Sequence, residues 1–260
     1  MIAAICAEGL QKQFGSTLVV DQVTLSVRQG TCFGFIGPNG AGKTTTIRLL
    51  AGLLTPTAGL VRIFGQSYDE AAMAIRARLG LVQDDLLLYE YLTGEEQALF
   101  ISRLYNLEAN LANRRAEELF LLLGLEDCRR RLIRSYSKGE RKKLTLLCAL
   151  IHDPDLLFLD EPFEGMDVMG LRTVEEILRQ MIQRGKTVFL TSHILSWVDR
   201  LCAEIAIINQ GKIVFFGPKD LLQSTLQTAT DRRNKGSDLE QVFLALIHAE
   251  KQEGRLSWFS

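Results

Sequence analysis

Residues 37–44 read Gly37-Pro38-Asn39-Gly40-Ala41-Gly42-Lys43-Thr44 and match the phosphate-binding pattern G-x-x-x-x-G-K-[ST] at every fixed position. The three glycines give the backbone conformations that other residues avoid, so that successive N–H groups can point at phosphate oxygens. Lys43 adds a positive charge for the β- and γ-phosphates, and the Thr44 hydroxyl can bind Mg²⁺. The stretch therefore predicts a binding site for a nucleoside triphosphate.

The sequence on either side of this loop has the pattern that the motif requires. An apolar run, residues 31–36, precedes the loop, and residues 45–54 follow it with helical character. This predicts a strand, a glycine loop and a helix whose N-terminus points at the anion. The alternative is an ordinary glycine-rich turn, and the strand and helix on its two sides argue against it.

Composition excludes several classes of protein. The chain has 260 residues, with 30 Lys and Arg against 31 Asp and Glu, so no basic excess indicates nucleic-acid binding. The five cysteines are scattered without zinc-site spacing, which favours free thiols in a reducing compartment. The sequence has no run of about 18 apolar residues and no basic start of a secretion signal. We expect a cytosolic protein whose membrane role, if it has one, depends on a partner.

Strands and helices alternate along most of the chain. Apolar strands are predicted at 156–159 and 187–191, with a helix from Leu171 to Arg184 between them, and this order indicates a parallel sheet buried on both faces. Leucine and alanine at helical spacing predict a helical insert over about 90–134, and 205–216 reads as a final hairpin.

Two carboxylates follow the strand at 156–159. Asp160 and Glu161 would lie at the carboxyl edge of the sheet, where ligands bind in open α/β folds. Beside a phosphate loop, Asp160 would hold the Mg²⁺ shell and Glu161 would polarise the attacking water. The alternative is a strand that ends in an acidic turn.

With these residues the sequence resembles the ATP-binding subunit of ABC transporters over nearly its whole length. That family has a signature motif, usually Leu-Ser-Gly-Gly-Gln, at the start of a helix before the acidic strand. Residues 136–140 read Tyr136-Ser137-Lys138-Gly139-Glu140, so Ser137 and Gly139 match, whereas positions 138 and 140 depart as in many exporter-type subunits. The resemblance implies contact with the γ-phosphate held by the opposite subunit. By itself, Ser137 is equally a plain helix N-cap.

Three further elements of the family follow in order. Residues 164–167, with Asp167, resemble the D-loop, which communicates across a dimer, and His193 resembles the switch histidine that senses the γ-phosphate. Residues 12–15 resemble the adenine-stacking loop, with Phe14 where many members have tyrosine. Phe14 could also be a core residue.

The glutamine loop is the one element that departs from the family pattern. Counting back from residues 89–93, the expected glutamine position is occupied by Asp84, and Gln83 lies one residue earlier. Either Gln83 serves as catalytic and metal-contacting residue, or Asp84 replaces it. A carboxylate could bind Mg²⁺ but would repel the nucleotide.

The resemblance implies a RecA-like P-loop NTPase core of α/β class, with an antiparallel β edge subdomain and a helical subdomain insert at about 85–150. We expect an ATP-binding domain over 1–222 and a C-terminal extension over 223–260. The nucleotide-binding loop residues implied by the family are Gly37, Pro38, Asn39, Gly40, Ala41, Gly42, Lys43, Thr44 and Thr45.

The implied function is hydrolysis of ATP, with Mg²⁺, to move a substrate across a membrane. Each composite site needs a second ATP-binding subunit, identical or homologous. The membrane part would be a separate permease docked near 83–100, which would hold the protein at the cytoplasmic face. The segment 239–244 resembles a feature common beside exporter-type members, and this resemblance favours export. Two alternatives stay open: a non-hydrolysing, ATP-gated regulatory subunit, and a soluble ABC ATPase not involved in transport.

Overall fold

Two β-sheets form the centre of the fold in the computed structural model, which describes residues 3–83, 88–163, 165–192 and 195–221. The larger sheet has the strand order β10 (Lys212–Pro218), β9 (Glu204–Asn209), β3 (Cys32–Ile36), β8 (Thr187–Thr191), β7 (Leu156–Asp160) and β6 (Leu79–Val82). Its neighbouring strands are parallel except for the β9–β10 pair. The smaller sheet is antiparallel, in the order β2 (Thr17–Arg28), β1 (Ala3–Phe14), β4 (Ala58–Ile63) and β5 (Gln66–Ser67).

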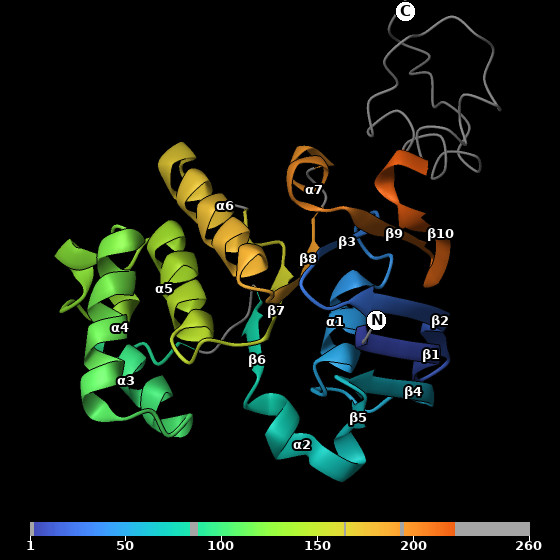
Figure 1. Cartoon of the computed structure of the whole chain (residues 1–260), viewed down its shortest axis with the longest axis horizontal. Coiled ribbons are helices and arrows are strands. Elements are labelled where there is room, and N and C mark those ends of the chain that lie inside the picture. Colours follow the sequence, from blue (N-terminus) through green and yellow to red (C-terminus); the bar gives the residue numbers. More distant parts are fainter. Residues whose placement is uncertain (1–2, 84–87, 164, 193–194, 222–260) are drawn as a thin grey trace, which may run out of the picture.

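Helices lie on both sides of the larger sheet (Figure 1). The α-helices of the described residues are α1 (Lys43–Leu50), α2 (Tyr68–Arg76), α3 (Gly94–Leu104), α4 (Ala109–Leu122), α5 (Lys138–Leu150), α6 (Val168–Gln183) and α7 (Leu195–Leu201). Short 3₁₀ turns occur at Glu126–Cys128 and Ile133–Ser135. Among the described residues, none of the helices combines the length and the apolar character needed to cross a bilayer.

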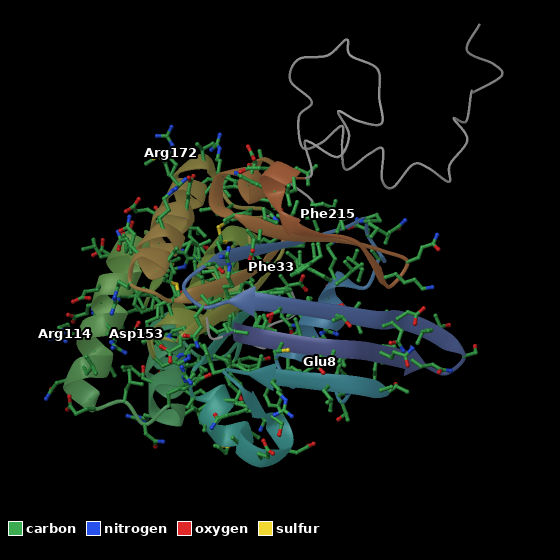
Figure 2. All side chains as sticks on the ribbon, turned by 45° about the vertical axis from the view of Figure 1, so that its right-hand side comes forward. Glu8, Phe33, Arg114, Asp153, Arg172 and Phe215 are labelled. Atoms are coloured by element: carbon green, nitrogen blue, oxygen red, sulfur yellow. The ribbon has the colours of Figure 1, made fainter. Side chains whose placement is uncertain are left out.

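The larger sheet separates two hydrophobic cores. On one face, which we call the α1-side core, its strands pack against α1 and the smaller sheet. On the other face, the α6-side core, they pack against α5, α6 and α7. Phe33, Phe35 and Phe158 each lie with ring centroids 5.5 or 5.6 Å from that of Phe189, all in the α1-side core. Figure 2 shows Phe33 in the interior, whereas Arg172 extends to the surface from α6.

The helices α3, α4 and α5 form a lobe beside the edge strand β6 (Figure 1). Thr93 begins α3 with a capping box, in which its hydroxyl accepts from the Glu96 N–H and the Glu96 carboxylate accepts from the Thr93 N–H. The lobe contributes Ala98, Ala116 and Phe120 to the α6-side core. The structure therefore has helices where the spacing of leucine and alanine predicts them. The bounds of the helical subdomain, about 85–150, and the end of the ATP-binding domain at residue 222 stay predictions.

The predicted strands at 31–36, 156–159, 187–191 and 205–216 are confirmed within one or two residues as β3, β7, β8 and the β9–β10 hairpin. Two helix boundaries differ. The helix predicted over 45–54 runs from Lys43 to Leu50, because Gly52 has a φ of +68° and ends it. The helix predicted from Leu171 begins at Val168, because the Asp167 carboxylate caps it by accepting from the Gly170 N–H at 2.6 Å.

The short strand β6 and the helix α2 lie in a stretch for which the sequence predicts no element. β6 has four residues, one of them Gly80, and glycine weakens a strand pattern. The structure explains this glycine, since a Cβ at Gly80 would lie 2.4 Å from the backbone oxygen of Ala149 in α5. Gly80 thus lets α5 approach the sheet edge closely.

Candidate functional site

The phosphate-binding loop connects β3 to α1 and leaves the N-terminus of α1 open. Gly42 occupies the cap position with a φ of +105°, and no side chain caps the helix. The first turn of α1 has no acidic residue. Free N–H groups and a positive helix end therefore face the loop, which is the arrangement that binds phosphate.

The three loop glycines are needed for different reasons. Gly40 and Gly42 have positive φ, as the motif predicts. Gly37 is not among the residues with positive φ, but a Cβ there would lie 2.3 Å from the backbone oxygen of Ile208 in β9. The expectation of an unusual backbone conformation is therefore wrong for Gly37, which is required for space.

Lys43 is folded back into the loop. Its Nζ donates to the carbonyl oxygens of Gly37 at 2.8 Å and Pro38 at 3.2 Å, and it lies 3.5 Å from Oε1 of Glu161. The Lys43 side chain is only 7% exposed. Thr44, the next residue, is exposed, and Thr45 is half-buried. The structure thus brings the cation of the loop together with the acidic end of β7.

Asp160 and Glu161 differ in their surroundings. Asp160 is buried as the last residue of β7, and its Oδ1 accepts from the Thr191 hydroxyl at 2.6 Å. Glu161 has a φ of +47°, a conformation that costs a non-glycine residue about 1–3 kcal/mol and that occurs most often at functional sites. Its N–H donates to Thr191 O and lies 3.2 Å from the Thr191 hydroxyl. Thr191 on β8 therefore fixes both acidic residues, a role that the sequence does not reveal.

The signature segment starts α5 as a capping box. The Ser137 hydroxyl accepts from the Glu140 N–H at 3.2 Å, and the Glu140 carboxylate accepts from the Ser137 N–H at 2.7 Å. The hydrogen bond from the Ser137 N–H lowers the pKa of Glu140. Glu140, one of the two departures from the family motif, is thus used to start the helix.

The other departure, Lys138, lies along the segment that follows Glu161. A Cβ at Gly165 would be 3.5 Å from the Lys138 side chain, and one at Gly139 would be 3.3 Å from Gly165 O. Asp167 Oδ2 lies 3.9 Å from Lys143 Nζ. The start of α5 therefore contacts the D-loop-like segment closely. Glu164, in the same segment, lies outside the described residues.

Phe14 ends β1 and is 47% exposed, with Lys12 Nζ 5.2 Å from its ring centroid. This excludes the core alternative. Gln83 follows β6, and its Nε2 is buried without a hydrogen-bond partner among the described residues. Asp84 and His193 lie outside the described residues, so their predicted roles stay predictions.

Comparison with known proteins decides the family. The sequence profile of the family described as ABC transporter matches residues 20–164, which is more than half of the chain. The chain belongs to this family. As an ABC transporter ATP-binding protein, it binds ATP and is an ATPase, and its α/β fold is that of the P-loop NTPases.

Several named relatives of the ABC protein are similar over most of its length. It is 38% identical to "Daunorubicin resistance ATP-binding protein DrrA3" of Streptomyces coeruleorubidus, over 88% of this chain and 72% of the relative. It is 39% identical to "Nod factor export ATP-binding protein I" of Cupriavidus pinatubonensis, over 84% of this chain and 67% of the relative. A solved "ATP binding subunit of ABC transporter" has a TM-score of 0.86 at 27% identity, covering 94% of this chain and 99% of the other.

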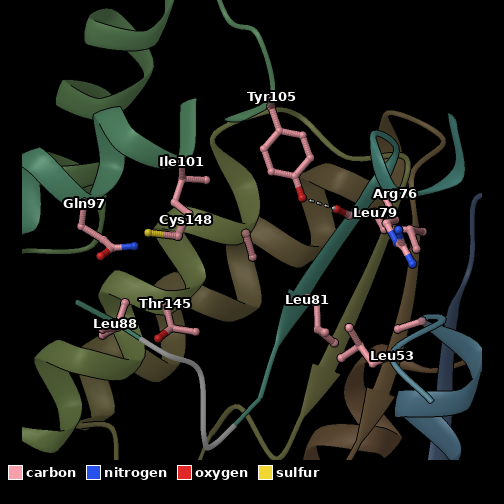
Figure 3. A pocket seen from close by; sticks show the side chains of 12 residues that line it. Leu53, Arg76, Leu79, Leu81, Leu88, Gln97, Ile101, Tyr105, Thr145 and Cys148 are labelled. Carbon is pink, nitrogen blue, oxygen red and sulfur yellow. Dashed lines mark hydrogen bonds between the residues drawn. The ribbon is translucent and has the colours of Figure 1, made fainter. Parts of the chain in front are cut away.

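A groove lies between the sheet core and the helical lobe of the ABC protein (Figure 3). Its cavity volume is about 270 Å³, and its apolar wall includes Leu53, Leu81, Leu88 and Ile101. Tyr105 closes one end, where its hydroxyl donates to Leu79 O at 3.4 Å. Leu88 and Gln97 in this lining belong to the segment 83–100 that the sequence associates with the permease, and Ile101 directly follows it. An apolar concave surface of this kind is typical of an interaction site.

Proposed function

We propose that this ATPase powers export by a separate membrane permease, as a subunit that pairs with a second ATP-binding subunit. The observation that carries the proposal is the 3.5 Å approach of Lys43 Nζ to Glu161 Oε1. A cation for the terminal phosphates and a carboxylate able to polarise water meet at the carboxyl edge of the sheet. Names of relatives that include drug resistance and Nod factor export support the direction of transport.

The residues around Lys43 and Glu161 would each have a separate role in ATP binding or hydrolysis. The loop from Gly37 to Thr45 would hold the phosphates through its N–H groups, with Lys43 moving from its carbonyl partners to the phosphate oxygens. Glu161 would accept a proton from the attacking water. His193 would sense the γ-phosphate, and Phe14, whose ring is exposed beside Lys12, would stack on the adenine.

The residues present also fit Mg²⁺. Magnesium prefers one or two protein oxygens together with substrate phosphates. Thr44 offers an exposed hydroxyl at the start of α1, and Asp160 offers a carboxylate whose orientation Thr191 fixes. Gln83 is the further candidate through its amide oxygen, whereas its buried Nε2, which has no hydrogen-bond partner among the described residues, is a donor and would face a phosphate or water oxygen. When bound, Mg²⁺ would neutralise phosphate charge, and the orientation of the water and the transfer of its proton would depend on Glu161.

The proposed dimer follows from the position of the signature segment. Ser137 caps the start of α5, and by the resemblance of this segment to the family signature its contact with phosphate would be made across a dimer. Two copies, or this chain and a homologue, would pair head-to-tail with Ser137 and Gly139 of one facing Lys43 of the other. Asp167 would lie at the same interface. The permease would dock in the apolar groove of Figure 3 and hold the protein at the membrane.

The test is steady-state Mg-ATPase activity of the purified chain against its concentration, with Glu161→Gln as control. A hydrolysing dimer gives activity that rises faster than linearly with concentration and is lost in the variant. Activity that is strictly proportional to concentration at all dilutions contradicts the dimer. ATP binding without turnover, even when the permease is present, contradicts the proposal and supports the ATP-gated regulatory subunit.

A further inference from the structure

The backbone of Glu161 is held from two sides by elements far apart in the sequence. Its N–H is bound to Thr191 on β8, as described above. Its carbonyl oxygen accepts from Nζ of Lys142 on α5 at 3.1 Å, and Lys142 is half-buried. The next residue, Pro162, has no N–H to contribute, and Phe163 is anchored by stacking on Trp197 with ring centroids 4.5 Å apart.

This double attachment matters because Glu161 has an unfavourable conformation. A φ of +47° persists in a glutamate only when neighbouring groups fix it. Rotation of the Glu161 backbone that moves its Cα–Cβ bond would swing the carboxylate away from Lys43 and would also displace the carbonyl oxygen, since both are attached to the same Cα. The hydrogen bond from Lys142 opposes that rotation, and a charged donor makes it stronger than a neutral one.

We propose that Lys142 is a positioning residue for ATP hydrolysis, which holds the Glu161 peptide so that the carboxylate faces the phosphate loop. The inference rests on the proposed role of Glu161. Lys142 is on the same helix as Ser137 and Gly139, less than two turns away, so a shift of the signature helix moves the Lys142 ammonium group. In the proposed dimer, the start of α5 would contact the ATP held by the opposite subunit, whereas Glu161 would act on the ATP held by its own phosphate loop. Lys142 therefore transmits the position of α5 at one ATP site to the glutamate at the other.

Two variants of Lys142 and one control test this. Lys142→Met keeps the length of the side chain but removes the donor, and Lys142→Arg restores a cationic donor. Lys186→Met is the matched control, because Lys186 Nζ makes two ion pairs, at 2.8 Å to Asp155 and 3.5 Å to Asp153, in the segment that precedes β7. Lys186→Met thus removes a lysine that makes ion pairs of its own and leaves the described contacts of Glu161 in place.

The first measurement is amide hydrogen exchange of the peptide over residues 156–167, which needs no turnover. We expect faster exchange in Lys142→Met than in wild type and in Lys186→Met. The second is steady-state kinetics, in which Lys142→Met lowers kcat by about tenfold or more and leaves the KM for ATP within about twofold, since a small misplacement of a reacting group has effects of this size. Lys142→Arg regains most of kcat, and Lys186→Met retains it.

The outcomes separate this inference from the proposed function. Unchanged exchange in Lys142→Met overturns the inference, whether or not the wild-type protein hydrolyses ATP. With a hydrolysing wild type, a kcat within about twofold of normal, or a loss of activity that Lys142→Arg does not restore, also overturns it. If wild type binds ATP without hydrolysis but exchange changes as expected, the proposed function fails, while the structural role of Lys142 is supported.

Discussion

Nζ of Lys43 lies 3.5 Å from Oε1 of Glu161, with the two side chains only 7% and 17% exposed. The carboxylate thus neutralises the lysine that the phosphate-loop motif assigns to the terminal phosphates. In the proposed mechanism, phosphate oxygens would replace Glu161 as partners of Lys43, and the carboxylate would then be available to the attacking water. This ion pair would therefore connect ATP binding to the proposed hydrolytic role of Glu161.

Glu161→Gln is expected to abolish turnover while ATP binding is retained or strengthened, because the amide neither accepts a proton from water nor competes for Lys43. With ATP, this variant should accumulate as a dimer on size-exclusion chromatography. Lys43→Met is the control and should lose ATP binding by about 100-fold or more, as expected for a desolvated charge contact. A monomeric Glu161→Gln variant at saturating ATP would contradict the dimer.

Gly37→Ala and Gly40→Ala should differ strongly. A methyl group added at position 37 would lie 2.3 Å from Ile208 O, so β9 or the loop must move. A methyl group at position 40 would meet open space, and the substitution costs only the strain of a positive φ, about 1–2 kcal/mol. We expect Gly37→Ala to lose most ATP binding and to unfold at lower temperature. Gly40→Ala should keep the fold and weaken binding modestly. Equal effects in titrations with a fluorescent ATP analogue would show that space at Gly37 does not matter.

The stability of the protein should fall as pH decreases from about 6.5 to about 4. His152 stacks on Tyr105 with ring centroids 3.6 Å apart, and its Nε2 lies 2.8 Å from Leu79 O. Burial first, and then the nearby Arg115, lower the pKa of His152 to about 4, although the bond to Leu79 O and the charge of Asp153 oppose the shift. The unfolded chain therefore binds a proton that the folded chain excludes throughout this window.

The free energy of unfolding should decrease by up to about 3 kcal/mol through this proton. The decrease is nearly complete at pH 4 and absent above pH 7. Urea unfolding at a series of pH values measures it. His152→Phe keeps a ring against Tyr105 but cannot be protonated, so its stability should depend less on pH in this window. An equally steep dependence in His152→Phe would assign the effect to other groups.

Gln83→Ala should slow hydrolysis more than Asp84→Ala. The buried Nε2 of Gln83 has no partner among the described residues, which is costly unless a ligand uses it. Removal of this amide should therefore lower kcat without loss of stability. Turnover and thermal unfolding of the two variants give the ranking, and the reverse order would assign the glutamine-loop role to Asp84.

A charge in the groove of Figure 3 should uncouple the ATPase from its permease. Ile101→Glu places a carboxylate on the apolar wall, which is expected to weaken docking by about 100-fold, while ATP binding by the isolated chain stays unchanged. Leu121→Glu is the control, because Leu121 is an exposed residue of α4 that does not line the groove. Co-purification with the permease is the measurement, and retention by Ile101→Glu would place docking elsewhere.

Local patterns in the sequence predict the parts of the fold that depend on local chemistry. The phosphate loop, the acidic end of β7 and the Ser137 cap each depend on a few consecutive residues, so the sequence predicts their place. The contacts that complete the site join distant segments. Thr191 reaches Asp160 from 31 positions away, and Lys142 reaches Glu161 from 19 positions away. No periodicity or motif contains such pairs, because they are created when α5 and β8 pack beside β7.

The three central strands of the larger sheet, β3, β7 and β8, place their phenylalanines on one face. Phe33, Phe35, Phe158 and Phe189 all lie in the α1-side core, whereas Leu157, Leu159, Val188 and Leu190 lie in the α6-side core. A strand displaced by one residue would exchange the faces, and since both faces are apolar, hydrophobicity alone would not oppose the error. Instead, side-chain shape selects the register, because the rings of Phe33, Phe35 and Phe158 each pack against Phe189 only when the strands are correctly aligned. The alignment of Asp160 with Thr191 thus depends on the contact of Phe158 with Phe189, which lie two residues earlier on the same strands and on the same face of the sheet.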